Sequence, residues 1–152
     1  MTHVLETGFE IMDNDNPNKS PRVRGYNIIN GELRLASDGS TFESRSPARL
    51  EDCLGEFPQS TREDVHDALR AARDSFATWS STPAPTRGQI IGNMGRLLME
   101  YKDDIVRVET REIGKTLKES AGEVQEAIDT CLFFQSEGMR LYGQTVNSEL
   151  PD

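Results

Sequence analysis

Residues 109–124 read E-T-R-E-I-G-K-T-L-K-E-S-A-G-E-V and contain the predicted end of one helix and the predicted start of the next. Gly114 can close a last helical turn in the left-handed conformation without steric cost, because it has no Cβ atom. Thr116 can accept hydrogen bonds from the free N–H groups of a new helix, and Glu119 stands where it completes a capping box. The sequence therefore predicts two helices that meet within three residues.

Helical periodicity extends to both sides of this junction. A first helix is predicted from the capping pair Thr61 and Asp64. Its apolar face would consist of Val65, Ala68, Leu69, Ala72, Phe76 and Trp79. Pro83 and Pro85 would end it, because proline lacks an N–H group and clashes with the preceding turn. A second helix is predicted over 86–101, with these side chains buried: Ile90, Ile91, Met94, Leu97 and Leu98.

A third helix is predicted over 103–113 and a fourth over 117–142. The fourth would be about 39 Å long at about 1.5 Å per residue, which is close to the diameter of a globule of this size. It would protrude unless more protein surrounds it. Its acidic edge is either a solvated face or a surface for basic partners; it consists of Glu119, Glu123, Glu126 and Asp129.

Residues 25–58 predict a small antiparallel β meander. Asn30 and Gly31 suit the positive φ angles of a type I′ turn, so the flanking strands at 26–29 and 32–35 should form a hairpin. Two further strands are predicted at 41–44 and 51–57. Such a small sheet needs other elements to cover it.

Residues 1–24 are rich in turn formers without an apolar period, which predicts a mobile arm. Asp13 and Asp15 imitate a calcium-binding loop. Asn18 and Arg24, however, stand where that loop requires glycine and glutamate, so calcium binding is not expected.

Composition excludes several classes of function. Acidic residues outnumber basic ones by 26 to 17, which gives a formal net charge of -9. No basic stripe is present for a nucleic acid, and no apolar run reaches the roughly 20 residues that span a bilayer. The first residues lack the pattern of a signal peptide. We therefore expect a cytoplasmic protein that binds neither nucleic acid nor membrane.

Short motifs for catalysis or cofactor binding are incomplete. Lys115 follows a glycine as in a phosphate-binding loop, but Glu109 stands where that motif needs another glycine. The glycines at positions 88, 92 and 95 follow a proline-rich turn instead of a strand, so they are expected to allow close helix packing rather than dinucleotide binding.

Nucleophiles and metal ligands are also isolated from one another. Cys53 and Cys131 lie beside acidic residues, which disfavour a thiolate, and are expected to be reduced, part-buried thiols. His3 and His66 match no ligand or triad pattern. The sequence therefore predicts no catalytic, cofactor-binding or metal-binding residue. The aromatic residues Trp79, Phe133 and Phe134 are either core or the lining of a substrate mouth.

Several segments together resemble the amino-terminal third of the aldehyde dehydrogenase superfamily, from about residue 27 to residue 152. They are the turn at Asn30 and Gly31, S-P-A-R-L-E-D-C-L-G-E-F-P at 46–58, S-T-R-E-D-V-H-D-A-L-R-A-A-R-D-S-F-A-T-W at 60–79, Arg87, the stretch 109–124, and R-L-Y-G-Q-T-V-N-S-E-L-P at 140–151. The sequence of 114–124 is most similar to that of superfamily members that act on semialdehydes of small acids.

The resemblance implies an α/β parent fold and oxidation of an aldehyde to a carboxylate with NAD or NADP. A cysteine thiolate attacks the carbonyl, hydride passes to the nicotinamide, and water hydrolyses the thioester. The segments that carry the catalytic cysteine, the glutamate and the cofactor turn match nothing here. The resemblance also places Glu112 near a monovalent cation in some members, and Glu126 and Thr130 near the substrate entrance in others.

These observations predict three regions: an arm at 1–24, a hairpin and meander at 25–58, and an incomplete helical part of a cofactor-binding domain at 59–152. The chain would be a truncated portion that is inactive and binds no cofactor alone. Its partner would be the missing carboxyl-terminal part or a full-length subunit, and the complete enzyme would be a homo-oligomer. The alternative is an acidic helical interaction module that associates with a full-length dehydrogenase subunit.

Overall fold

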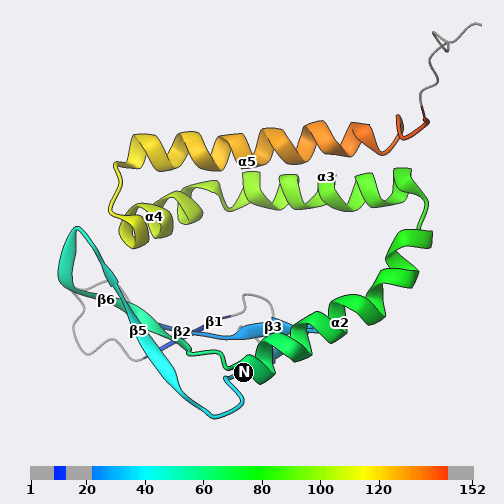
Figure 1. Ribbon diagram of the computed structural model, residues 1–152. Helices are drawn as coiled ribbons and strands as arrows, with labels where there is room; N and C mark the ends of the chain where they lie inside the picture. The colour runs from blue at the N-terminus through cyan, green and yellow to red at the C-terminus, as the bar shows by residue number, and fades with distance from the viewer. Residues whose placement is uncertain (1–8, 13–21, 144–152) are drawn as a thin grey trace, which may run out of the picture.

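The computed structural model describes residues 9–12 and 22–143. The strands are β1 (Phe9–Ile11), β2 (Val23–Gly25), β3 (Asn27–Ile29), β4 (Glu32–Arg34), β5 (Thr41–Ser46) and β6 (Arg49–Pro58). The helices are α2 (Arg62–Ser81), α3 (Ala84–Glu100), α4 (Lys102–Ile113) and α5 (Leu117–Glu137). Figure 1 shows the strands on one side, α3 and α5 side by side on the other, and α2 connecting the two. None of the described helices is both long and apolar enough to cross a membrane.

The predicted hairpin is confirmed. Strands β3 and β4 pair in antiparallel fashion, with Ile28 opposite Leu33. Asn30 and Gly31 between them have φ angles of 55° and 76°, as a type I′ turn requires. The turn residues therefore have the conformation from which the hairpin was predicted.

The other strands depart from a single meander. They form one sheet in the order β1-β2-β6-β5, and β2 runs parallel to β6. The predicted mobile arm at 1–24 did not include strands, whereas the structure places β1 within this range and the start of β2 at its end. Residues 1–8 and 13–21 lie outside the described ranges. Gly55 permits the parallel pairing, because a Cβ atom there would lie 2.0 Å from the carbonyl oxygen of Val23.

Both predicted capping boxes are confirmed. Thr61 caps α2, and its N–H donates to Asp64 Oδ2 at 2.7 Å. Thr116 caps α5 in the same way with Glu119. Gly114 ends α4 with a φ angle of 76°. The junction between α4 and α5 therefore has the local structure that its sequence predicts.

Helix α5 is shorter than predicted, because it ends at Glu137 instead of residue 142. Gly138 is buried against α3, where a Cβ atom would lie 2.5 Å from the carbonyl oxygen of Ala84. After it the chain continues in turns, with N–H groups of Met139 and Arg140 donating to Ser136 and Glu137. The helix thus ends where its backbone comes into close contact with α3. The apolar periodicity of the sequence does not reveal this contact.

The glycines of α3 provide the close helix packing that the sequence predicts. Cβ atoms at Gly88 and Gly95 would lie 2.5 Å from the carbonyl oxygen of Gln135 and 2.8 Å from Cβ of Cys131, respectively. The backbones of α3 and α5 therefore approach too closely for side chains at these positions.

The core is small. Among the described residues, the cluster of Val106, Val124 and Ile128 is buried between α4 and α5, with Leu98, Ile105 and Ala121 packed around it. Seven apolar residues are buried in the described ranges, whereas twenty-two large apolar residues are exposed.

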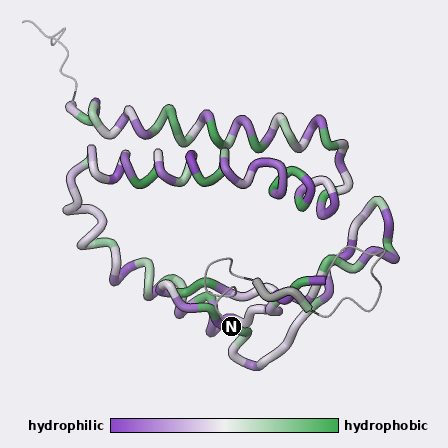
Figure 2. The backbone as a smooth tube through the Cα atoms, turned by 180° about the vertical axis from the view of Figure 1, so that it is seen from behind, coloured by the Kyte–Doolittle hydropathy of each residue, from purple (hydrophilic) through white to green (hydrophobic). Residues whose placement is uncertain are grey.

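The exposed apolar residues include faces that amphipathic helices normally bury. Phe76 on α2 is 66% exposed, and the prediction that α3 buries Ile90, Met94 and Leu97 is wrong, because each is about half exposed. Figure 2 shows hydrophobic segments spread along the backbone of the helices. The described residues contain no element that could cover these faces.

Candidate functional site

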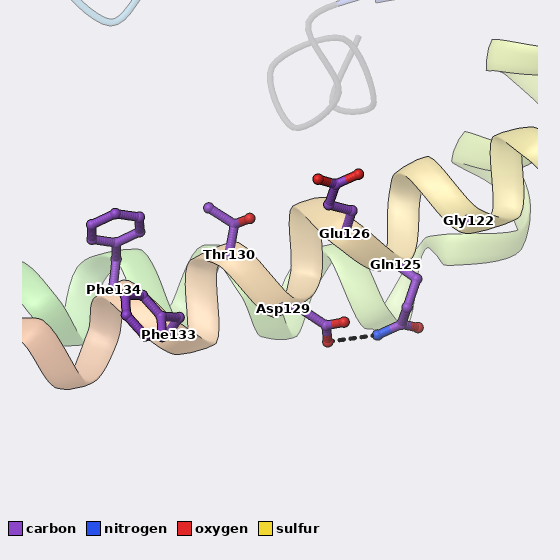
Figure 3. Close-up of a pocket in the computed structure, with 7 residues that line it drawn as sticks. All are labelled: Gly122, Gln125, Glu126, Asp129, Thr130, Phe133 and Phe134. Carbon is purple, nitrogen blue, oxygen red and sulfur yellow. Dashed lines mark hydrogen bonds between the residues drawn. The ribbon is translucent and has the colours of Figure 1, made fainter.

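A hollow on α5 collects several residues that the sequence analysis named separately. Its volume is about 540 Å³. It is lined by Gly122, Gln125, Glu126, Asp129, Thr130, Phe133 and Phe134 (Figure 3). All seven come from one helix, so the spacing of three and four residues along α5 places them on neighbouring turns. The same spacing could have identified Gly122 and Gln125, which the sequence analysis did not name.

The side chains in this hollow project in two directions. Glu126, Thr130 and Phe134 point to one side of α5, and Gln125 and Asp129 point to the other, where Gln125 Nε2 donates to Asp129 Oδ1 at 2.9 Å (Figure 3). Phe133 and Phe134 meet edge to face with ring centroids 5.3 Å apart. The hollow thus combines an aromatic pair with two carboxylates, an amide and a hydroxyl.

Both aromatic residues of this hollow lie at the surface. Phe133 and Phe134 are more than half exposed, and Trp79 on α2 is exposed as well. The structure thus does not bury them in a core formed by the described residues. Their surface positions are compatible with the interpretation as lining, which remains a prediction.

The acidic edge of α5 is partly used inside the chain. Glu119 belongs to the capping box, and the N–H and hydroxyl of Thr116 lower the pKa of its carboxyl group. Lys115 Nζ pairs with Glu123, which lowers the pKa of that carboxyl group. Only Glu126 and Asp129 of the edge line the hollow.

Glu109 joins this ion pair from α4. Lys115 Nζ lies 3.8 Å from Glu109 Oε1, and the neighbouring carboxyl group of Glu123 raises the pKa of Glu109. The ion pair with Glu123 also raises the pKa of Lys115. Lys115 is therefore engaged by carboxylates from both helices.

Another ion pair fixes α4 to the sheet. Arg111 donates from Nε and Nη2 to the two carboxylate oxygens of Asp52 at 2.8 and 2.7 Å. Arg111 Nη2 also donates to the carbonyl oxygen of Cys53 at 3.2 Å, and the Asp52 carboxylate raises the pKa of Arg111. The sequence analysis missed this pair, because its members are 59 residues apart.

The remaining candidates are dispersed. Cys53 lies on β6 and Cys131 is buried against α3, and both are free thiols. His66 accepts a hydrogen bond from Arg62 on the exposed side of α2, whereas His3 lies outside the described ranges. Glu112 is exposed on α4. No group of three or more His, Cys, Asp or Glu residues in the described ranges could hold a metal ion.

Known structures share this arrangement of strands and helices. The NAD-dependent aldehyde dehydrogenase of Sinorhizobium meliloti superposes with a TM-score of 0.78 and 25% identity, over 94% of this chain and 29% of its own. Betaine aldehyde dehydrogenase of Staphylococcus aureus, in complex with NAD+, gives 0.75 and 27% over 84% of this chain and 25% of its own. The chain therefore has the arrangement of the matching part of these aldehyde dehydrogenases, and the predicted α/β parent fold is confirmed.

Sequence comparison agrees with the fold. The model of the aldehyde dehydrogenase family matches residues 35–152. An alpha-ketoglutarate semialdehyde dehydrogenase of Haloferax volcanii is 35% identical over 83% of this chain and 26% of its own length. The NADP(+) succinate-semialdehyde dehydrogenase of Escherichia coli is 34% identical over 89% of this chain and 28% of its own. The chain belongs to the aldehyde dehydrogenase family and spans about a quarter of the length of these relatives.

Proposed function

We propose that this chain is the amino-terminal segment of an NAD- or NADP-dependent dehydrogenase that oxidises an aldehyde or semialdehyde to a carboxylate, and that it is inactive without the rest of the fold. The relatives named for semialdehydes support the substrate class. The observation that carries the proposal is the exposed apolar face of α2 and α3, which fits the packing surface of a larger domain.

The hollow on α5 would then lie at the substrate entrance. Glu126 and Thr130 line it, and the resemblance to the family would place both near the entrance. The chain itself would contribute shape and polarity at this entrance, while the thiolate, the cofactor site and the base would come from the remaining part. Free thiols at Cys53 and Cys131 accord with a cytoplasmic location, and the complete enzyme would be a homo-oligomer.

A turnover assay tests the proposal. The purified chain is incubated with NAD+ or NADP+ and with succinate semialdehyde or malonate semialdehyde, and formation of the reduced nicotinamide is followed by absorbance. We expect no turnover from the chain alone and thiol-dependent turnover when the remaining three-quarters of the Escherichia coli relative is co-expressed with it. Turnover by the chain alone would refute the proposal. Co-purification with an intact dehydrogenase subunit, without gain of activity, would favour an interaction module instead.

A further inference from the structure

A second groove lies where the end of α2, the start of α3 and the end of α5 meet. Its volume is about 490 Å³. The large apolar side chains that line it are Trp79, Ile91, Met94, Phe134 and Leu141. Two charged residues, Arg87 and Glu137, also line it. The groove is therefore apolar, with few charged groups that could orient an occupant.

Arg87 lacks an acceptor in this groove. Its Nε atom is shielded from solvent and has no hydrogen-bond partner among the described residues. No hydrogen bond joins Arg87 Nε to Glu137, whose carboxylate pairs with Arg140 instead. An N–H donor that is withdrawn from water without an acceptor costs free energy. Arg87 Nε thus lacks an acceptor oxygen in the groove, and a group outside the described residues could supply it.

The start of α3 adds positive character to the same place. Pro83 precedes the helix and provides no side-chain cap, and the first turn contains no acidic residue. The first N–H groups of a helix carry partial positive charge. In a chain of net charge -9, this groove therefore favours a negatively charged occupant.

We propose that the groove docks the remaining part of the aldehyde dehydrogenase fold through a carboxylate side chain, flanked by apolar side chains, that pairs with Arg87. This inference rests on the proposed function. A carboxylate matches the two parallel donors of a guanidinium group and compensates its charge, which a neutral acceptor does only in part. The apolar lining then excludes water from the pair.

Capture of a co-expressed partner tests the docking. The tagged chain is co-expressed with the remaining three-quarters of the Escherichia coli succinate-semialdehyde dehydrogenase, and the amount of captured partner is measured. We expect Arg87→Met to reduce capture by about tenfold or more, as loss of a buried charged hydrogen bond does. Arg73→Met, which removes the same charge from an exposed position on α2, should change capture by less than about twofold.

One further measurement on Arg87→Met and one further variant make the test decisive. Since Arg87 has no partner within the described residues, Arg87→Met should leave the melting temperature of the chain alone unchanged or higher. Glu137→Gln should leave capture unchanged within about twofold. If Glu137→Gln reduces capture as much as Arg87→Met, the partner of Arg87 is internal and the inference is wrong. It is also wrong if the wild-type chain captures nothing, or if Arg87→Met captures as much as wild type; the latter result would leave the proposed function intact.

Discussion

Gly114 holds the junction between α4 and α5 in a backbone conformation that is costly for other residues. Its φ angle is 76°, and a Cβ atom would lie 3.0 Å from Cγ of Pro47. Gly114→Ala should therefore lower the free energy of unfolding by about 1–2 kcal/mol. Urea titrations followed by circular dichroism measure the change.

Gly114→Asn is the matched control, because asparagine enters the left-handed region more readily than alanine. It brings the same Cβ atom towards Pro47 but should lose less stability than Gly114→Ala. Equal losses for the two variants would mean that the contact, and not the φ angle, dominates.

Asp64 makes the start of α2 sensitive to acid. Its carboxylate accepts from the N–H groups of Thr61 at 2.7 Å and Ser37 at 3.0 Å. The Thr61 N–H group first, and the Ser37 N–H group next after the opposing effect of desolvation, lower the pKa of Asp64. A carboxyl group with a lowered pKa stabilises the fold above its ordinary pKa, and this contribution is lost as the pH falls through the lowered value.

Asp64→Asn should therefore lower the free energy of unfolding at pH 7, because the amide keeps one acceptor oxygen but loses the negative charge. The difference from wild type should shrink as the pH falls below about 4. Urea titrations at pH 7, 5, 4 and 3 measure it. Asp74→Asn, on the exposed side of the same helix, controls for the loss of one negative charge, and a difference that persists at pH 3 would contradict the assignment.

At the scale of elements, the contact between α3 and α5 depends on the absence of side chains. A Cβ atom at Gly88 would lie 2.5 Å from the backbone carbonyl oxygen of Gln135, which cannot move without its helix. Gly88→Ala should therefore separate the two helices and cost about 1–3 kcal/mol of stability.

Gly122→Ala is the matched control, because a Cβ atom there meets nothing within 4 Å. It should raise the free energy of unfolding by about 0.5–1 kcal/mol through helix propensity alone. Urea titration of both variants gives the comparison. A stabilising effect of both substitutions would contradict close packing at Gly88.

Local signals explain which elements the sequence predicts well. The turn at Asn30 and Gly31 and the caps at Thr61 and Thr116 each depend on residues within a few positions. The parallel pairing of β2 with β6 and the end of α5 depend instead on residues far apart in sequence. The same distinction applies to the functional residues. The residues of the α5 hollow could be predicted from the spacing along one helix, whereas the Asp52–Arg111 pair could not, because it joins distant segments.

At the scale of the whole molecule, buried and exposed apolar residues should contribute very differently to stability. Ile128 is 1% exposed at the centre of the small core, so Ile128→Ala should cost about 2–5 kcal/mol. Phe76 on α2 is 66% exposed, so Phe76→Ala should change stability by less than about 0.5 kcal/mol. Urea titration of the chain alone compares the two.

Capture of the co-expressed partner should separate these variants in another way. Phe76→Ala, which leaves the chain alone intact, should still weaken capture, because the apolar face of α2 is proposed to pack against the remaining fold. If Phe76→Ala destabilises the chain alone as strongly as Ile128→Ala, this face already packs within the chain.

The length of helix α2 also constrains the geometry of the protein. Its 20 residues extend about 30 Å, and residues 72–81 are all exposed between the strands and α3 (Figure 1). Inserting or deleting one residue would turn everything beyond it by about 100°. Loops elsewhere in the chain can vary in length at small cost. The length of α2 cannot vary in this way, because its number of residues sets the distance and the relative rotation between the strands and α3.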